Sequence, residues 1–369
     1  MPGRAARQLV LFEKDDVRPP QPRQVVEDAA AGDTAADDHC PGPSRYHAAE
    51  YFSFRRKGLV QISGRFYTRR VLADEILESV PELHEARAVE PLPGGLTNTN
   101  YKVSTDSGAY VVRVAGEDTS LLAIDRENEV HNTIAAAEVG VGARVVAYMP
   151  EQGALVLEFI EGQTQAAEDL RRGDRLHLVA DACRRLHGAR RFRDDFNMFE
   201  IQRGYLTIVR ERRFRLPDRY LEFEPQVRAI EEAMRVRDEG TVPCNNDLLA
   251  ENFIDVGDQF RLIDYEYSGN NDACFELGNV WSESNLTLEQ LDRLVAEYYG
   301  RPLPSKVARA RLWGLMSKYG WTLWGSIQEG ISSIDFDFWA WSMEKYERAV
   351  EEFDSPGFER LLEDVQAAD

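Results

Sequence analysis

The spacing of apolar residues changes along the chain and predicts two kinds of structure. Short apolar runs separated by turns occupy residues 88–159, interrupted by one helical pattern at residues 125–138 that Asp125 is suited to cap. From about Gln165 onwards helical spacing dominates, and the only expected break is a β-hairpin before Asp264. The strands expected in the first part are residues 88–90, 100–103, 110–114, 145–148 and 154–159. The pattern predicts an α+β protein in which an antiparallel sheet precedes a helical region.

Residues 1–45 lack this patterning. Prolines bracket a run rich in Ala, Asp and Glu with few large apolar residues, so a disordered N-terminal extension is expected. Apolar runs at residues 51–54 and 59–62 indicate an added element, and a helix is expected at residues 72–83. The predicted units are therefore the extension, a sheet-containing lobe at residues 46–160 and a helical lobe at residues 161–369.

Net charge and cysteine content narrow the classes of partner and compartment. The 369-residue chain has a net charge of −20, which disfavours nucleic acids and anionic membranes and favours a small cationic ligand, although solubility alone can account for such an excess. No apolar run approaches the roughly 20 residues needed to span a membrane. Four cysteines lie far apart without a CxxC pair, so neither a zinc site nor a disulfide framework is expected, and the cytoplasm is the simplest compartment.

An ordered set of three polar residues is the strongest chemical signal in the chain. Asp247 is followed five residues later by Asn252, and twelve residues after that by Asp264. A carboxylate can orient an acceptor hydroxyl and take its proton, whereas an amide oxygen and a second carboxylate are ligands that Mg²⁺ prefers. The pattern is typical of ATP-dependent phosphotransfer sites, with Asp247 as the catalytic base and Asn252 and Asp264 as metal ligands.

The segment between the last two of these residues supports this interpretation. Residues 253–256 and 260–263 are short apolar runs on either side of a turn at Gly257, which is a hairpin pattern. A tight hairpin would bring Asn252 and Asp264 close enough for one ion to touch both. The alternative is that Asp and Asn are ordinary turn formers here.

A glycine-rich turn is a candidate phosphate-binding element. Gly94 and Gly95 lie between two expected strands and are followed by Leu96, Thr97 and Asn98. Glycines let backbone N–H groups approach phosphates closely, and Thr97 and Asn98 add side-chain donors. An ordinary hairpin turn is the alternative interpretation. The segment does not match GxxxxGK[ST], so a P-loop NTPase is not supported.

Arg113 is a cation in the middle of an apolar strand. If the side chain faces inwards, it needs an anionic partner or ligand. It could bind the phosphates of ATP while a carboxylate of the following helix holds it, and Glu129 is preferred to Glu127 for that role. The alternative is that Arg113 lies on the exposed face of the strand.

A cluster of aromatic residues near the C-terminus is a candidate site for a cationic group. Trp321 and Trp324 share a helix face, and Trp341 follows in an aromatic-rich segment. Aromatic faces attract quaternary and protonated amines, although a stripe at helical spacing is more often hydrophobic core. Glu266 and Tyr267, which directly follow the third motif aspartate, favour a pocket for a cation.

These motifs together resemble those of the choline/ethanolamine kinase family, within the aminoglycoside-phosphotransferase-like superfamily. The similarity covers about residues 70–360, and residues 321–336 distinguish this family from the rest of the superfamily. The matching segments are residues 94–98, 110–114, 246–252, 263–267 and 321–336. The resemblance implies a bilobal protein-kinase-like fold, with a small antiparallel-sheet N-lobe and a larger helical C-lobe. It also implies phosphorylation of an amino alcohol hydroxyl with ATP and Mg²⁺ as cofactors.

Carried over residue by residue, the resemblance assigns roles to the candidate residues. Asp247 is implied to be the catalytic base, and Asn252 and Asp264 the Mg²⁺ ligands. Arg113 matches the basic residue on ATP, and Glu129 matches its helix partner. The adenine-binding hinge is implied at residues 158–163, which begin with Glu158, Phe159 and Ile160. The implied amine pocket contains Tyr267, Trp321, Trp324 and Trp341, with Trp341 in place of a more usual tyrosine.

One departure from the family pattern bears on activity. Asn245 stands where the family commonly has a histidine that supports the catalytic loop. The substitution is compatible with an active kinase but also with weak activity or a changed role. The open alternatives are a kinase for another hydroxylated cation, such as an aminoglycoside or thiamine, and an inactive kinase-like binding protein. A homodimer is also left open.

Overall fold

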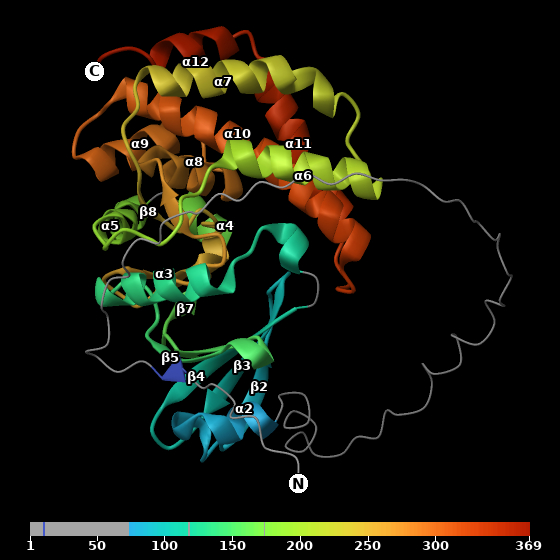
Figure 1. Cartoon of the computed structure of the whole chain (residues 1–369). Helices are drawn as coiled ribbons and strands as arrows, with labels where there is room; N and C mark the ends of the chain where they lie inside the picture. The colour runs from blue at the N-terminus through green and yellow to red at the C-terminus, as the bar shows by residue number, and fades with distance from the viewer. Residues whose placement is uncertain (1–9, 12–73, 117–118, 173) are drawn as a thin grey trace, which may run out of the picture.

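The computed structural model describes residues 10–11, 74–116, 119–172 and 174–369 and consists of two lobes (Figure 1). The expectations for residues 1–45 and for the runs at 51–54 and 59–62 lie outside the described residues, apart from strand β1 (Val10–Leu11). The α+β architecture predicted from the pattern is confirmed, with the sheet in one lobe and most helices in the other.

The N-lobe is built on an antiparallel sheet with the strand order β1-β5-β6-β4-β3-β2. Its strands after β1 are β2 (Ala88–Leu92), β3 (Asn98–Ser104), β4 (Ala109–Ala115), β5 (Val145–Met149) and β6 (Ala154–Glu158). Apolar side chains at alternate positions, such as Tyr110 and Val112 on β4, are buried together with Val103. Helix α2 (Asp74–Ser79) and the turn η1 (Pro81–Leu83) pack on this face through residues such as Leu77 and Leu83.

Helix α3 (Arg126–Glu138) covers the opposite face of the sheet, after the short turn η2 (Thr119–Leu122). The Asp125 side chain accepts a hydrogen bond from the Asn128 backbone N–H at 3.0 Å, as expected for an N-cap. Val130 of α3 packs against Val145 and Leu155 of the sheet. The helix thereby lies between the sheet and the C-lobe, where its first turn can reach both lobes (Figure 1).

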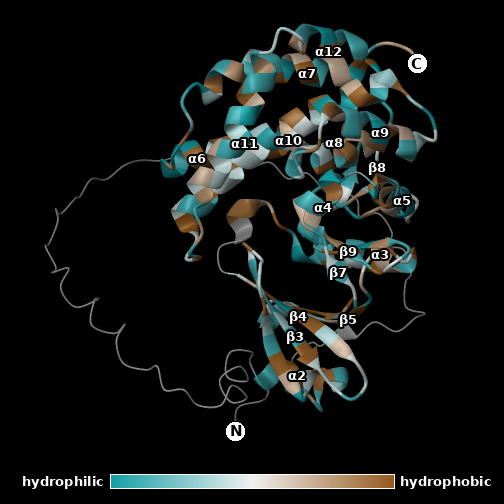
Figure 2. Cartoon of the chain, turned by 180° about the vertical axis from the view of Figure 1, so that it is seen from behind, coloured by the Kyte–Doolittle hydropathy of each residue, from teal (hydrophilic) through white to brown (hydrophobic). Residues whose placement is uncertain are grey.

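The C-lobe is mainly helical and is organised around the 28-residue helix α10 (Pro304–Ile331). Its other helices are α4 (Ala167–Arg171), α5 (Leu176–His187), α6 (Met198–Arg212), α7 (Glu224–Val236), α8 (Ala273–Glu283), α9 (Leu288–Tyr299), α11 (Phe338–Phe353) and α12 (Phe358–Asp364). Helices α8 and α10 carry many of the hydrophobic positions in the interior of this lobe (Figure 2). Most of α10 is buried, because it packs against α6, α8 and α11.

Two glycines allow α8 and α10 to cross closely. A Cβ atom on Gly278 would lie 2.0 Å from the carbonyl oxygen of Ala310, and one on Gly314 would lie 2.6 Å from the carbonyl oxygen of Gly278. Any larger side chain at either position would force the two helices apart. The close crossing fixes α8, whose polar side chains reach the loop that follows Cys244.

Short strands of the C-lobe position the polar motif residues. Strands β9 (Phe253–Asp255) and β10 (Phe260–Leu262) form the predicted hairpin, and β7 (Gln163–Thr164) pairs with β9. A second pair, β8 (Val242–Cys244) with β11 (Gly269–Asn271), corrects the expectation that one hairpin alone interrupts the helices. Residues Gly269, Asn270 and Asn271 carry no apolar side chain, so periodicity gave no sign of the buried strand that they form.

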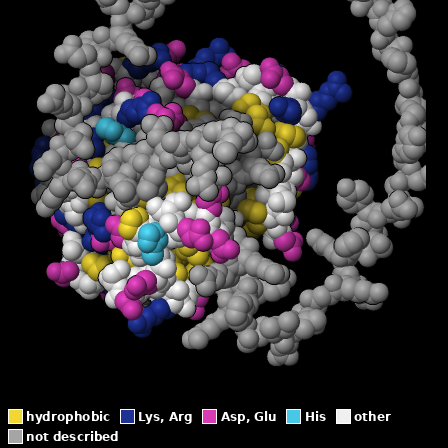
Figure 3. Space-filling view, turned by 60° about the horizontal axis from the view of Figure 1, so that its bottom comes forward, with side chains coloured by type: hydrophobic (Ala, Val, Ile, Leu, Met, Phe, Trp, Pro, Cys, Tyr) yellow, Lys and Arg dark blue, Asp and Glu magenta, His cyan; other side chains and the backbone are white. Residues whose placement is uncertain are grey.

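The surface at the N-lobe end carries charges of both signs (Figure 3). On the face seen from the N-lobe end, Lys and Arg side chains lie interspersed with Asp and Glu side chains (Figure 3). Among the described residues, no helix is both long enough and apolar enough to cross a membrane.

Candidate active site

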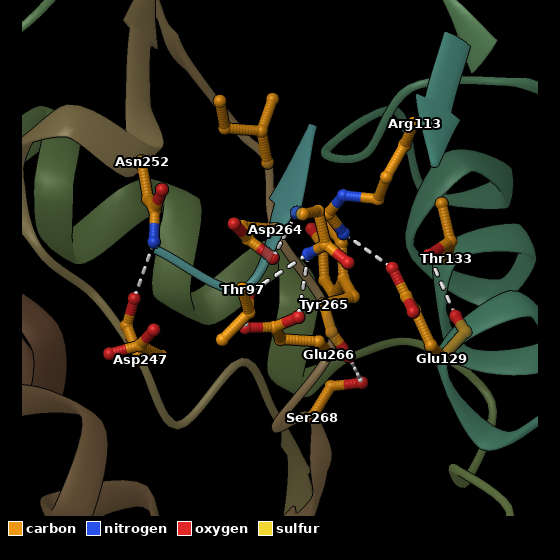
Figure 4. Close-up of polar contacts among 12 residues, drawn as sticks. Thr97, Arg113, Glu129, Thr133, Asp247, Asn252, Asp264, Tyr265, Glu266 and Ser268 are labelled. Carbon is orange, nitrogen blue, oxygen red and sulfur yellow. Dashed lines mark hydrogen bonds and ion pairs between the residues drawn. The ribbon is translucent and has the colours of Figure 1, made fainter. Parts of the chain in front are cut away.

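The three motif residues lie at the ends of short C-lobe strands (Figure 4). Asp247 follows β8, Asn252 ends the turn η5 (Ala250–Asn252), and Asp264 follows β10. The Ile263 N–H donates to the carbonyl oxygen of Asn252 at 3.1 Å, which closes the hairpin between the last two motif residues. The structure therefore brings Asn252 and Asp264 together at the open end of the hairpin.

The donor set at this position suits a hard divalent cation. The Asn252 amide nitrogen donates to the backbone carbonyl of Asp247 at 2.6 Å, so the polar atom left over is the amide oxygen. Asp264 has a positive φ of 63°, which is uncommon for a residue with a side chain. An amide oxygen and a carboxylate on adjacent backbone segments are the kind of ligands that Mg²⁺ takes.

Asn245 connects the loop that carries Asp247 to the segment that carries Asp264. Its side-chain nitrogen donates to the backbone carbonyls of Asp264 at 2.9 Å and Ile263 at 3.2 Å. Its side-chain oxygen accepts from the Asp247 backbone N–H at 3.1 Å. An amide has a donor and an acceptor at once, so the side chain ties Asp247 to Asp264 through backbone groups. With Asn245 in place of the usual histidine, the loop that carries Asp247 is thus still held by side-chain hydrogen bonds.

Side chains of helix α8 hold the loop of residues 245–248 through its backbone N–H groups. The Glu276 carboxylate accepts from the backbone N–H groups of Asn245, at 2.5 Å, and Asn246, at 3.3 Å. The Asn279 side chain accepts from the Leu248 N–H at 2.6 Å. Sequence reasoning missed both supports. The available signal was a pair of polar residues three apart on one face of an otherwise apolar helix.

Asp247 is a half-buried carboxylate at the centre of the site. Burial raises the pKa of the Asp247 carboxyl well above its usual range. Three neighbouring carboxylates raise this pKa further, and the ammonium of Lys345 opposes them. These carboxylates belong to Asp264, Glu283 and Glu266. A carboxylate whose pKa is raised is a stronger proton acceptor once ionised, which suits a general base.

Arg113 of β4 faces inwards and is 8% exposed, which excludes the exposed-face alternative. Its guanidinium forms ion pairs with Glu129 of α3 and with Asp264 of the C-lobe (Figure 4). Glu127 instead contacts Arg193 at 2.9 Å, so the preference for Glu129 is confirmed. Burial disfavours the charged guanidinium, but the surrounding carboxylates outweigh it and raise the pKa of Arg113. The side chain therefore remains a cation between the two lobes.

Glu266 lies against the glycine-rich turn, and its side chain is engaged there. Its carboxylate accepts from the Thr97 hydroxyl at 2.7 Å and from the Asn98 amide at 2.8 Å, and Arg126 lies 3.3 Å away. The Glu266 carboxylate, expected to favour a pocket for a cation, holds the N-lobe turn in this structure. Burial, reinforced by the charge of Asp264, raises the pKa of Glu266 to about 7. The donors of Thr97 and Asn98 expected on phosphate are likewise engaged by Glu266.

Arg126 is a central residue of this network that sequence reasoning missed. One of its two terminal guanidinium nitrogens donates to Glu129 at 2.7 Å, and the other terminal nitrogen donates to the Asn98 side-chain oxygen at 2.7 Å. An arginine in the first turn of a helix opposes the helix dipole, and this was the signal of a local anionic partner. Through Arg126, the turn, α3 and Glu266 form one connected set of polar contacts.

The glycine-rich turn at residues 94–98 has a backbone conformation that glycine readily adopts. Gly94 and Gly95 have φ values of 87° and 90°, and a Cβ atom on Gly95 would lie 2.7 Å from the carbonyl oxygen of Asn98. The carbonyl oxygen of Leu96 accepts from the Gln328 side chain of α10 at 2.9 Å. The turn is thus fixed to the C-lobe at two places, Gln328 and Glu266.

The residues of the expected hinge follow strand β6. Glu158 forms a surface ion pair with Arg144 at 2.8 Å, and the Phe159 N–H donates to Ala109 at 2.9 Å. Phe159 and Ile160 are half-buried. They lie on the segment that joins the last strand of the N-lobe sheet to β7.

The four residues of the expected amine pocket lie together, and we call them the aromatic group: Tyr267, Trp321, Trp324 and Trp341. The indole N–H of Trp324 donates to the Tyr267 hydroxyl at 2.8 Å, and the ring centroids of Tyr267 and Trp321 are 4.9 Å apart. The centroids of Trp324 and Trp341 are 5.3 Å apart. Trp341 is half-buried and the other three are buried. The Asn246 side chain donates to the backbone carbonyl of Tyr267 at 3.1 Å, which places the group beside the loop that carries Asp247.

The fold and the arrangement of the site are those of the two-lobed, protein-kinase-like class. A family profile for choline/ethanolamine kinases matches residues 89–293, and the chain belongs to that family. It is 29% identical to ethanolamine kinase 2 of Mus musculus over 258 residues, which covers 62% of this chain and 66%, just under two thirds, of that protein.

Solved structures support the same family. The choline/ethanolamine kinase family protein from Mesorhizobium loti aligns with a TM-score of 0.70 at 28% identity, covering 79% of this chain and 98% of that one. Choline kinase LicA from Streptococcus pneumoniae aligns with a TM-score of 0.63 at 26% identity, covering 76% of this chain and 98% of that one. The resemblance inferred from the sequence motifs is confirmed.

Proposed function

We propose that the protein is a MgATP-dependent kinase that phosphorylates the hydroxyl of an amino alcohol such as choline or ethanolamine. The observation that carries the proposal is the position of Asp247. Among the described residues, no hydrogen bond or ion pair occupies its carboxylate oxygens. Asn252 contacts its backbone, Asn245 links it to Asp264, and Asn246 next to it contacts Tyr267 of the aromatic group. A free carboxylate between oxygen ligands and aromatic rings is what transfer to a cationic alcohol requires.

In the proposed reaction, Asp247 orients the acceptor hydroxyl and receives its proton. The acceptor oxygen forms a bond to the γ-phosphorus of ATP as the bond to the β–γ bridging oxygen breaks, and ADP leaves with that electron pair. Asn252 and Asp264 would hold Mg²⁺, which supplies neutralisation of phosphate charge when it is bound. Asn245 keeps Asp247 in register with Asp264 through its contacts to the backbone.

The nucleotide would lie between the glycine-rich turn and residues 158–160. Because Thr97 and Asn98 are engaged by Glu266, the backbone N–H groups of Gly94, Gly95 and Leu96 are left to approach the phosphates. Arg113 would turn part of its charge to the phosphates while Glu129 retains it. Glu158, Phe159 and Ile160 would contact the adenine.

The aromatic group would receive the ammonium of the acceptor. Its rings offer π faces from the C-lobe, and an ammonium over such a face is attracted to it. A cytoplasmic location fits both the use of ATP and the buried free thiols of Cys183, Cys244 and Cys274.

The test is ADP release measured with MgATP and a panel of choline, ethanolamine and kanamycin. We expect turnover with an amino alcohol, loss of turnover with EDTA, and a fall in kcat of at least ~100-fold in Asp247→Asn with ATP binding retained. Turnover with kanamycin alone would replace the proposed substrate class. Near wild-type turnover in Asp247→Asn would remove the catalytic assignment.

A further inference from the structure

Each carboxylate that surrounds Asp247 already has a cation of the protein as its partner. Asp264 is paired with Arg113, Glu266 lies 3.3 Å from Arg126, and Glu283 is paired with Lys345. The last of these pairs is the one next to the aromatic group. Glu283 ends α8, Lys345 lies on α11, and the Lys345 ammonium lies 4.2 Å from the ring centroid of Trp341.

The pair between Lys345 and Glu283 is almost completely buried. The exposed fractions of the two side chains are 8% and 3%. One oxygen of Glu283 contacts Lys345, and the other is shielded from solvent with no hydrogen-bond partner among the described residues. A cation arriving at the aromatic group therefore meets a carboxylate that the chain has already neutralised.

The hydroxyl of the aromatic group is also engaged. The Tyr267 hydroxyl accepts a hydrogen bond from the Trp324 indole at 2.8 Å. The unpartnered indole N–H of Trp321 is a donor and cannot accept a hydrogen bond from an ammonium. What this part of the site offers to a cation is mainly aromatic surface.

We infer that Lys345 is a specificity-determining residue that makes the site select a quaternary ammonium alcohol over a primary one. This inference rests on the proposed function. A primary ammonium carries three N–H donors, and burying them without acceptors is costly. A quaternary ammonium has no N–H to satisfy and binds through the aromatic faces. Lys345 occupies one carboxylate oxygen of Glu283 and the other oxygen is shielded from solvent, so neither is offered to a primary ammonium.

The first experiment uses the wild-type protein and a series of acceptors. The kcat/KM values for ethanolamine, N-methylethanolamine, N,N-dimethylethanolamine and choline should rise with each methyl group, with choline at least about tenfold above ethanolamine. Equal or better use of ethanolamine would overturn the inference and leave the proposed kinase function standing. Absence of turnover with all four would instead reject the proposed function.

The second experiment tests Lys345 itself. Lys345→Met leaves Glu283 without its partner, so the ratio of kcat/KM for ethanolamine to that for choline should rise by about tenfold. The Lys345 ammonium also lowers the pKa of Asp247. A change in this pKa affects the turnover of ethanolamine and of choline alike, so it largely cancels in the ratio. Glu283→Gln combined with Lys345→Met should return the ratio to the wild-type value, because no carboxylate is then released.

Lys318 provides a matched control. It is a buried lysine 3.9 Å from the ring centroid of Trp281 and, within the described part of the chain, forms no ion pair. Lys318→Met should leave the acceptor ratio unchanged, with melting curves confirming that each variant is folded. An unchanged ratio in folded Lys345→Met would overturn the role of Lys345. The wild-type acceptor series decides the selectivity even if Lys345→Met does not fold.

Discussion

The two sides of the site are built by opposite means. On the N-lobe side, Arg113, Arg126 and Glu266 join segments far apart in sequence through buried charges and hydrogen bonds. On the other side, the aromatic group packs rings from α10 and α11 around Tyr267. A buried charge network depends on every partner being present, whereas packed rings share their contacts among many neighbours.

The comparison has an energetic consequence. Removing one partner of a buried ion pair costs about 3–5 kcal/mol, because the charge that remains is desolvated and unpaired. A cation over one aromatic face gains only ~0.5–2 kcal/mol. Single substitutions on the N-lobe side should therefore affect both stability and nucleotide binding, whereas those in the aromatic group should act mainly on the acceptor.

The largest effect is expected for Arg113→Met. This change leaves Glu129 and Asp264 without their shared cation, so the free energy of unfolding should fall by about 3–5 kcal/mol. Urea unfolding followed by circular dichroism measures it. Lys102→Met is the control on the neighbouring strand, where the pair with Glu161 is exposed and 3.5 Å long, and should cost less than about 1 kcal/mol. Similar losses in both variants would show that Arg113 has no special place in the network.

Asn245 joins the backbone of Asp247 to that of Asp264, and removing its side chain should lower kcat. Asn245→Ala leaves the Asp247 N–H and the Asp264 carbonyl without their side-chain partner. An unpaired buried group costs about 1–3 kcal/mol, so kcat should fall by roughly 5- to 150-fold if that cost bears on the reactive geometry. Steady-state kinetics measures the change.

The conservative variant Asn245→His separates support of the loop from a general loss of packing. A histidine also offers one donor and one acceptor nitrogen, so it should recover much of the lost kcat. If Asn245→Ala keeps wild-type kcat, the loop does not depend on this side chain.

Much of the fold and site could be predicted from the sequence, for local reasons. The strands, the N-cap at Asp125 and the hairpin before Asp264 depend on neighbouring residues, and the structure contains all of them. The pairing of Arg113 with Glu129 was also predictable, because a buried cation needs a nearby anion.

What could not be predicted depends on contacts between distant segments. Asn98 of the glycine-rich turn and Glu266 are 168 positions apart in the sequence, and no local pattern shows that they meet. The strand β11 was missed because its burial is set by packing and not by apolar side chains. The role of α8 in holding the catalytic loop was missed for the same reason, since Glu276 reaches Asn245 across the fold.

Asp247→Asn should show how much stability the protein loses by keeping an ionised carboxylate in this position. Because the folded-state pKa of Asp247 is raised, the carboxyl favours folding while protonated, and this contribution is lost as pH rises through the folded-state pKa. Without Mg²⁺ and nucleotide, Asp247→Asn should match the wild-type Tm near pH 4 and exceed it increasingly towards pH 8. Each unit of pKa shift corresponds to about 1.4 kcal/mol.

The control for this comparison is Asp258→Asn, at an exposed position in the turn of the hairpin formed by β9 and β10. Its Tm should follow the wild-type profile at every pH. A constant Tm difference between Asp247→Asn and the wild type from pH 4 to pH 8 would contradict the raised pKa.

The smallest effect concerns Trp324 of the aromatic group. Trp324→Leu removes one aromatic face and the donor to the Tyr267 hydroxyl, so the KM for choline should rise by roughly 2- to 30-fold, with the KM for ATP nearly constant. The neutral isostere 3,3-dimethylbutanol should be a poor substrate of the wild type. Trp313→Leu is the control, since Trp313 packs against Phe199 and Phe275 outside the group and should lower Tm without changing the choline KM. If Trp324→Leu behaves in the same way as Trp313→Leu, the aromatic group is hydrophobic core, and the ammonium binds elsewhere in the site.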